Sequence, residues 1–322
     1  MKQLFRQYGS VAALLALITA LAVLVTLLTG GFALGGDRDE GKQVLATTYP
    51  LYVAAQQILG DDTAVTLTRL DGAASGCLHD YQLSPADRRA VQEADLILMN
   101  GAGAESFLHG IAEEDKQVDT SAGLDLLCAA HHHDHGEEEH HHEEEYNEHV
   151  WLSPARYMGQ VRMIFQALCG LNPEKAHIYS ANTADYQMKI AAIQQEMEQL
   201  AVALDGTPRV LFHDSMAYLA ADLGLDVKLT LSVEGESGLS AHDLGQVEQL
   251  AAQHPDLLLL YDTQYALRYE GLAGNPLTLN TAVQGTGDPA DWLTAMGENV
   301  ENLKKSAADR SAKPQEKGGD AP

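Results

Sequence analysis

The chain has 322 residues, with 20 lysines and arginines against 46 aspartates and glutamates, and its formal net charge is −26. This length allows two domains with separate cores. The acidic balance argues against nucleic acid and anionic lipid surfaces as partners, and it favours cationic ligands. The sequence contains no Walker-type glycine loop, no dinucleotide-binding glycine fingerprint and no Gly-x-Ser-x-Gly motif, which argues against the enzyme classes that use them.

The N-terminal segment, residues 1–36, has the pattern of an export signal. Lys2 and Arg6 precede an apolar run over residues 11–28. About twenty apolar residues can span a bilayer, and most cleaved signals have a shorter apolar core. We therefore expect an uncleaved signal anchor, with a cleaved signal peptide as the alternative. The basic end should stay in the cytoplasm, so the chain from residue 37 onward is expected outside the cytoplasmic membrane, at the cell surface or in the periplasm.

Residues 37–171 alternate between strand and helix patterns, which is typical of an α/β lobe with a parallel sheet. Ser84 and Ser153, each followed by proline, are expected to cap helices. One predicted strand begins at residue 44, and three others cover 64–70, 95–100 and 116–119. Predicted helices cover 51–59, 84–94 and 153–168, and a further helix is expected to begin at residue 105.

Within this lobe, the loop 129–146 contains a tract of histidine, aspartate, glycine and glutamate with no apolar residue, from 131 to 145. Such a tract cannot pack a core, and neutral imidazole binds Zn, Cu, Fe and Ni. We expect an auxiliary metal-binding loop; a solvated acidic loop is the alternative, and an expression tag is disfavoured because the tract lies mid-chain. Its histidines are His131, His132, His133, His135, His140, His141 and His142.

Residues 172–205 predict a single helix of about thirty residues, roughly 45 Å long, which is long enough to tie two lobes together. The alternation then resumes over 206–304, which predicts a second α/β lobe, and 305–322 is polar and expected to be disordered. The expected fold is α/β, with two lobes that each contain a mainly parallel sheet flanked by helices, joined by a long rigid helix.

Three cysteines are present, Cys77, Cys128 and Cys169. Outside the cell one pair could form a disulfide and leave one cysteine over, but the spacing does not select a pair, and free buried thiols are equally compatible with the sequence.

Three histidines outside the loop lie near the ends of predicted strands or the start of a capped helix: His79, His149 and His213. In α/β sheets, ligands bind beyond the carboxyl ends of the strands, so a site between two lobes would gather them. Each histidine alone is more often structural. Together, neutral imidazoles in fixed geometry make a zinc site, and zinc usually takes four ligands.

The segments around these histidines resemble the three ligand motifs of zinc-binding subunits of bacterial ABC importers, in the zinc and manganese cluster of solute-binding proteins. The motifs are Cys77-Leu-His-Asp-Tyr-Gln-Leu-Ser-Pro, Asn147-Glu-His-Val-Trp-Leu-Ser-Pro and Phe212-His-Asp. The segment 94–108 and the acidic histidine loop also resemble that family, and the resemblance covers about residues 44–304.

The resemblance implies two α/β lobes with a metal buried in the cleft and His79, His149 and His213 as its ligands. Manganese-binding relatives usually carry a carboxylate at the third position, so His213 indicates zinc. The family's usual lipid-attachment cysteine is absent, which supports the predicted anchor.

The fourth ligand is where the chain departs from the family pattern. Asn280 stands where relatives often place an aspartate, and an amide oxygen is a weaker ligand. Asp262, after a predicted buried strand, is a second candidate, with a helix cap as its alternative role. Asp80 and Asp214, next to ligand histidines, are candidates for orienting the imidazoles, or are simply solvent-exposed.

These features predict a monomeric zinc-capture protein that delivers Zn2+, as transported ligand, to a separate permease and its ATPase. A surface adhesin or metal buffer is the first alternative. A zinc hydrolase with three histidines and a water is disfavoured, since no general base is clearly placed and no His-Glu-x-x-His motif exists. We expect no enzymatic activity.

Overall fold

The computed structural model describes residues 41–70, 81–129, 145–231, 238–263 and 271–312. The chain divides into two compact units, residues 1–41 and 42–322, and the described helices and strands all belong to the second. The predicted anchor, His79, Cys77 and the histidine tract lie outside the described residues. Among the described helices, none is long and apolar enough to cross a membrane.

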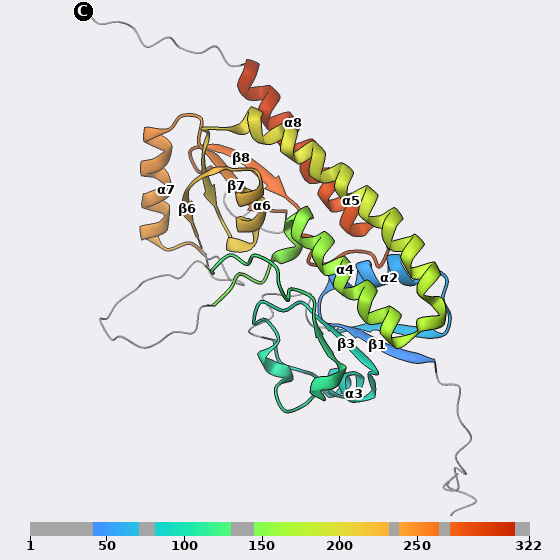
Figure 1. Cartoon of the computed structure of the whole chain (residues 1–322). Coiled ribbons are helices and arrows are strands. Elements are labelled where there is room, and N and C mark those ends of the chain that lie inside the picture. The colour runs from blue at the N-terminus through green and yellow to red at the C-terminus, as the bar shows by residue number, and fades with distance from the viewer. Residues whose placement is uncertain (1–40, 71–80, 130–144, 232–237, 264–270, 313–322) are drawn as a thin grey trace, which may run out of the picture. The chain divides into compact units, whose positions relative to one another are not determined.

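The first sheet contains four parallel strands in the order β2-β1-β3-β4, and its central strands β1 and β3 are labelled in Figure 1. Its strands are β1 (Lys42–Ala46), β2 (Val65–Arg69), β3 (Leu96–Met99) and β4 (Gln117–Asp119). The helices of this region are α2 (Tyr49–Leu59), α3 (Pro85–Glu93) and α4 (Pro154–Leu171). Ser84 and Ser153 accept from the backbone of α3 and α4, which confirms both predicted caps.

The second sheet repeats this topology, with the parallel order β6-β5-β7-β8. Its strands are β5 (Pro208–Leu211), β6 (Asp226–Thr230), β7 (Leu258–Asp262) and β8 (Asn275–Leu279), and its helices are α6 (Ala217–Asp222), α7 (Ala241–Gln253) and α8 (Asp291–Ala312). The central strands are buried, as expected of parallel sheets covered on both faces. The predicted fold of two parallel α/β lobes is confirmed.

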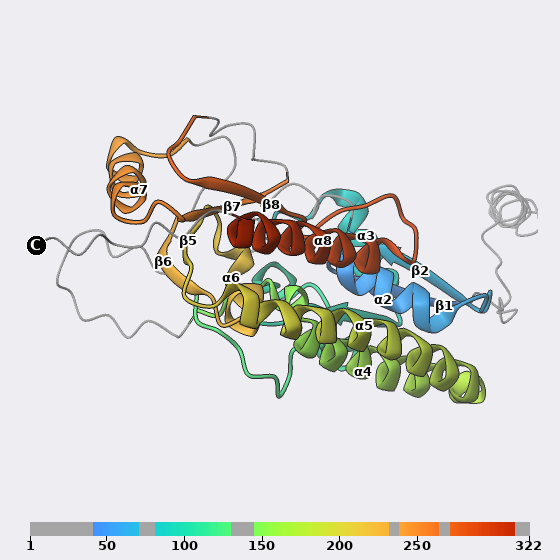
Figure 2. The ribbon, with the colours of Figure 1, turned by 90° about the horizontal axis from the view of Figure 1, so that it is seen from above.

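The two sheets are connected by α5 (Ala176–Leu204), a helix of 29 residues, which spans about 43 Å at 1.5 Å per residue. A short 3-10 turn, η6 (Pro173–Lys175), precedes it. In Figures 1 and 2, α5 runs alongside both α4 and α8. The predicted long connecting helix is therefore present.

The helices join the two sheets through a common core, since one cluster of buried side chains includes Leu98 of β3, Leu260 of β7 and Tyr186 of α5. Within it, Trp292 of α8 stacks on Tyr157 of α4 with ring centroids 4.2 Å apart. A wide hinge motion would have to open this close-packed core.

Two predicted elements differ from the structure. The helix expected from residue 105 is only a 3-10 turn, η3 (Ser106–Leu108), because the Glu105 side chain accepts from the backbone of Asn100 and Gly101 and holds this segment as a loop. The expectation of a disordered tail from 305 is also wrong in part, since α8 continues to Ala312.

Candidate metal centre

His149 and His213 lie together although one precedes the long helix α5 in the chain and the other follows it. Their ring centroids are 5.4 Å apart and the rings are almost perpendicular, at 85°. His149 directly precedes the 3-10 turn η5 (Val150–Leu152) that leads into α4, and His213 comes two residues after the last residue of β5. Two imidazoles at this distance can ligate one metal ion.

The topology of the second sheet explains the position of His213. The chain crosses from β5 to β6 on one side and reaches β7 on the other, so the carboxyl ends of β5 and β7 form a topological switch point. Ligands of open α/β sheets bind at this point. His213 follows β5 and Asp262 is the last residue of β7, so both lie at this edge.

The side chain of Asn147 determines which nitrogen of His149 faces a ligand. Its Nδ2 donates to the carbonyl oxygen of Asp214 at 2.8 Å, so its Oδ1 is an acceptor. That oxygen lies 2.9 Å from the backbone nitrogen of His149 and 3.1 Å from Nδ1. The Nδ1 therefore carries the proton, and the lone pair of Nε2 is available for a metal.

Burial lowers the pKa of His149, although the carboxylates of Glu148, Asp214 and Asp262 oppose this shift. The imidazole is therefore neutral at neutral pH. Because only neutral imidazole binds a metal, no proton has to leave this ring before ligation.

His213 has two possible partners at Nδ1. The backbone N–H of Ser215 donates to it at 3.0 Å, and Oδ1 of Asp214 lies 3.3 Å away. Ligation through Nε2 requires a proton on Nδ1, which then donates to Asp214 and replaces the bond from Ser215. The position of Asp214 thus fits the orienting role considered for it.

Asp262 is buried and accepts from Thr281 Oγ1 at 2.6 Å and from Thr263 Oγ1 at 3.2 Å. These two bonds hold the carboxylate at the end of β7. A carboxylate offers about four lone-pair sites, so it can accept both bonds and still ligate a cation. Its influence on the pKa of His149 places the charge within electrostatic reach of that ring.

Asn280 is differently placed. Its Oδ1 accepts from the backbone of Ala282 at 2.9 Å, and its Nδ2 donates to Glu298 of α8 at 3.3 Å. The amide therefore forms hydrogen bonds within the turn after β8 and to α8. The charged carboxylate of Asp262 is a stronger metal ligand than this uncharged amide oxygen.

The other predicted ligands cannot be placed, because His79 and the seven histidines of the tract lie outside the described residues, as does Asp80. Within the described residues, no three His, Cys, Asp or Glu side chains form a group that could hold a metal ion. Cys128 and Cys169 are free thiols.

Two side chains that support His149 were not predicted from the sequence. Asn147 belongs to the motif around His149, but its bonds to His149 and to Asp214 were not expected. Asn100, after β3, donates through Nδ2 to the carbonyl oxygen of Glu148 at 2.8 Å, and its backbone is held by the buried Glu105. One signal for each was present in the sequence: Asn100 ends the predicted strand 95–100, and Asn147 begins the motif around His149.

Two parallel α/β lobes with a common core, and a close pair of histidines at the switch point of one sheet, define the class of metal-binding solute-binding proteins. A family model described as "Zinc-uptake complex component A periplasmic" matches residues 44–306. The chain belongs to this family, which confirms the predicted resemblance. Its members are non-catalytic, extracytoplasmic metal-binding components that work with ABC permeases and ATPases, so the prediction of a non-enzymatic protein is also confirmed.

Similar proteins differ in the metal that they are named for. The "High-affinity zinc uptake system protein ZnuA" of Bacillus subtilis is 24% identical over 308 residues, which cover 90% of this chain and 96% of that protein. The "Iron-binding protein YfeA" of Yersinia pestis is 29% identical over 213 residues, which cover 65% of this chain and 66% of that protein.

Solved structures share the fold. The Zn(II)-bound ZnuA-like domain of Streptococcus pneumoniae AdcA matches with a TM-score of 0.67 and 21% identity, and covers 83% of this chain and 99% of that one. Pseudomonas aeruginosa FpvC in complex with Mn2+ matches with a TM-score of 0.68 and 19% identity, over 84% and 99%. At these identities the likeness concerns the fold, so the metal must be argued from this chain's own residues.

Proposed function

We propose that this protein captures Zn2+ outside the cytoplasmic membrane and delivers it to an ABC-type permease and its ATPase. The observation that carries the proposal is the close pair of imidazoles, the buried ring of His149 and the half-buried ring of His213, with Nε2 of His149 kept unprotonated by Asn147. Nitrogen ligands favour zinc over manganese, which prefers carboxylate and carbonyl oxygens. The Bacillus subtilis relative that is named for zinc uptake supports the same cargo.

The proposed ligands are His79, His149, His213 and Asp262. We rank Asn280 below Asp262 because its amide already bonds to Ala282 and Glu298. Three histidines and one carboxylate give the four-coordinate arrangement that zinc prefers. The histidine tract 131–145 acts as an auxiliary arm of weaker sites, and its glutamates raise the local concentration of cations.

The proposal includes a membrane anchor formed by residues 1–36, a monomeric protein, and lobes bounded at 37–171 and 206–304 with the connecting segment 172–205. The common core under α4, α5 and α8 supports release of the metal by small shifts of the lobes, because wide closure would disrupt buried packing.

Transport is tested in a strain that lacks the gene. We expect growth of this strain to fail in chelated medium and to recover when zinc is added, and uptake of radioactive zinc to fall. Normal uptake in the deletion strain would instead support the adhesin or metal-buffer alternative.

A further inference from the structure

The chain folds back on itself just before the His149 motif. Ala129 donates through its backbone to Glu145 at 2.8 Å, Asn147 donates to Leu127 at 2.8 Å, and Cys128 and Tyr146 form an antiparallel bridge between them. The two described arms, residues 127–129 and 145–147, thus form a short ladder that ends at Leu127 and Asn147.

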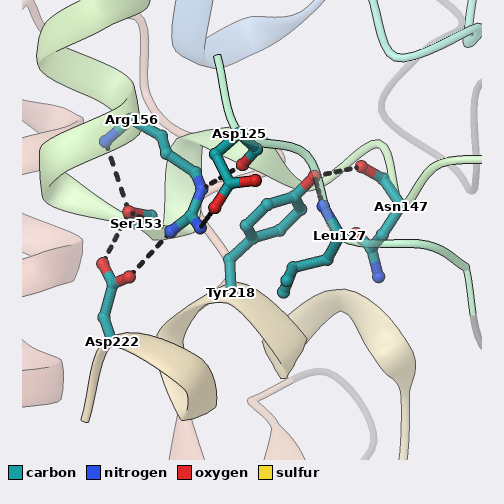
Figure 3. Close-up of polar contacts among 7 residues, drawn as sticks. All are labelled: Asp125, Leu127, Asn147, Ser153, Arg156, Tyr218 and Asp222. Carbon is teal, nitrogen blue, oxygen red and sulfur yellow. Dashed lines mark hydrogen bonds and ion pairs between the residues drawn. The ribbon is translucent and has the colours of Figure 1, made fainter. Parts of the chain in front are cut away.

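The hydroxyl of Tyr218, on α6, closes the end of this ladder. It accepts from the backbone N–H of Leu127 at 3.1 Å and donates to the carbonyl oxygen of Asn147 at 2.9 Å (Figure 3). Tyr218 is fully buried. Burial raises the pKa of Tyr218, so the hydroxyl keeps its proton at neutral pH and can make both bonds.

The ring of Tyr218 is held in place by Arg156 of α4. The guanidinium carbon of Arg156 lies 5.1 Å from the ring centroid, which is a cation–π distance. Arg156 also forms an ion pair with Asp222 of α6 at 2.8 Å and donates to the carbonyl oxygen of Asp125 at 2.7 Å (Figure 3). Ser153, the cap of α4, donates to Asp222 at 2.5 Å. The phenol therefore has a fixed position between α4 and α6.

Asn147 links Tyr218 to both histidines. Tyr218 holds its main chain, while its side chain accepts from His149 and donates to the backbone of Asp214, the residue after His213. A shift of the Asn147 backbone would move the amide that sets the His149 tautomer and would loosen the segment that carries His213. A single residue, Asn147, thus connects the phenol of Tyr218 to both imidazoles.

We propose that Tyr218 is a positioning residue of the metal centre, which acts through Asn147 on the tautomer of His149 and on the spacing between His149 and His213. This inference rests on the proposed function, in which His149 and His213 bind the cargo metal. Neither the motifs around the histidines nor the family match assigns a role to this tyrosine.

The test uses the full-length protein and Tyr218→Phe, which removes the hydroxyl and keeps the ring under Arg156. Outer groups that orient metal ligands typically contribute 10- to 100-fold to affinity, so we expect zinc affinity to fall about tenfold. Tyr186→Phe is the matched control, because Tyr186 is also fully buried and its hydroxyl lies 3.1 Å from Tyr157 in the common core. That variant should keep zinc affinity within about twofold of the wild type.

Two readouts separate positioning from general loss of stability. In the metal-free protein, nitrogen-15 NMR of the histidine side chains should show His149 protonated at Nδ1 in the wild type and in Tyr186→Phe, and a mixture of tautomers in Tyr218→Phe. In an Asn147→Ala background, Tyr218→Phe should cause little further loss of zinc affinity, because both changes act on one path.

An unchanged His149 tautomer and unchanged zinc affinity in Tyr218→Phe would overturn the proposal, and so would full additivity with Asn147→Ala. The NMR readout needs no metal. If the wild type lacked a tight zinc site, the proposed function would fail while the effect of Tyr218 on His149 could still be measured.

Discussion

His149 and His213 lie with ring centroids 5.4 Å apart although the 29-residue helix α5 separates them in the chain. Each is held by groups of its own surroundings. Asn147 contacts Nδ1 of His149, and the backbone N–H of Ser215 donates to Nδ1 of His213, with Oδ1 of Asp214 3.3 Å from the same nitrogen. Contacts within the protein therefore hold the two rings side by side.

The first prediction concerns the histidine ligands. Replacing His149, His213 or His79 by alanine should each reduce zinc affinity at least about tenfold, because each change removes a ligand that binds the metal directly. Competition with a chromogenic chelator measures the loss. His177→Ala, an exposed histidine on α5, is the control and should bind zinc as the wild type does. Unchanged affinity in any of the three variants would remove that residue from the ligand set.

The second prediction distinguishes the two candidates for the fourth ligand. Asp262→Asn should keep an acceptor for Thr281 but remove the negative charge, and should lower zinc affinity at least about tenfold. Asn280→Ala should change affinity less than about threefold, since its amide serves Ala282 and Glu298. The reverse order of effects would assign the fourth position to Asn280.

The positions of His149 and His213 in the fold were predictable because they depend on local patterns. An apolar strand followed closely by His213, and a serine-proline cap soon after His149, are visible in the sequence. The parallel sheets follow from the same alternation.

The support of the histidines was not predictable, because it depends on contacts between distant segments. The side-chain amide of Asn147 donates to the backbone of Asp214. The backbone carbonyl oxygen of Asn147 accepts from Tyr218, 71 residues further on. The 3-10 turn after Glu105 likewise results from a distant contact, because the buried carboxylate of Glu105 accepts from Thr47, the residue after β1. Periodicity and capping residues carry no information on such pairs.

The third prediction uses the pH dependence of stability. Glu105 accepts from Thr47, Asn100 and Gly101 while fully buried, and burial raises the pKa of Glu105 from 4.5 to about 7. The folded protein therefore keeps a proton that the unfolded chain loses above about pH 4.5. The contribution of Glu105 to the free energy of unfolding is largest below pH 4.5 and is lost as the pH rises to about 7, by an amount on the order of 3 kcal/mol.

Urea unfolding of metal-free protein between about pH 4.5 and 7.5 measures this dependence. Glu105→Gln removes the titrating group, so the stability of the wild type relative to this variant should fall steadily as the pH rises across this window. A constant difference between the two proteins would mean that Glu105 does not hold a proton in the folded protein.

The fourth prediction concerns the histidine tract. Deleting residues 131–145 should remove several weak zinc sites and leave the tight site intact, because the proposed tight ligands all lie outside the tract. Equilibrium dialysis at high zinc counts the weak sites. Loss of the tight site in the deletion variant would show that the tract supplies one of its ligands.

The most direct test of the central claim is calorimetric titration of zinc, and separately of manganese, into the metal-free full-length protein in the presence of a competing chelator. We predict one tight zinc site together with several weak ones, and feeble binding of manganese. Weak sites alone would mean that His79, His149 and His213 do not converge on a metal, and would contradict the proposal that this protein captures zinc.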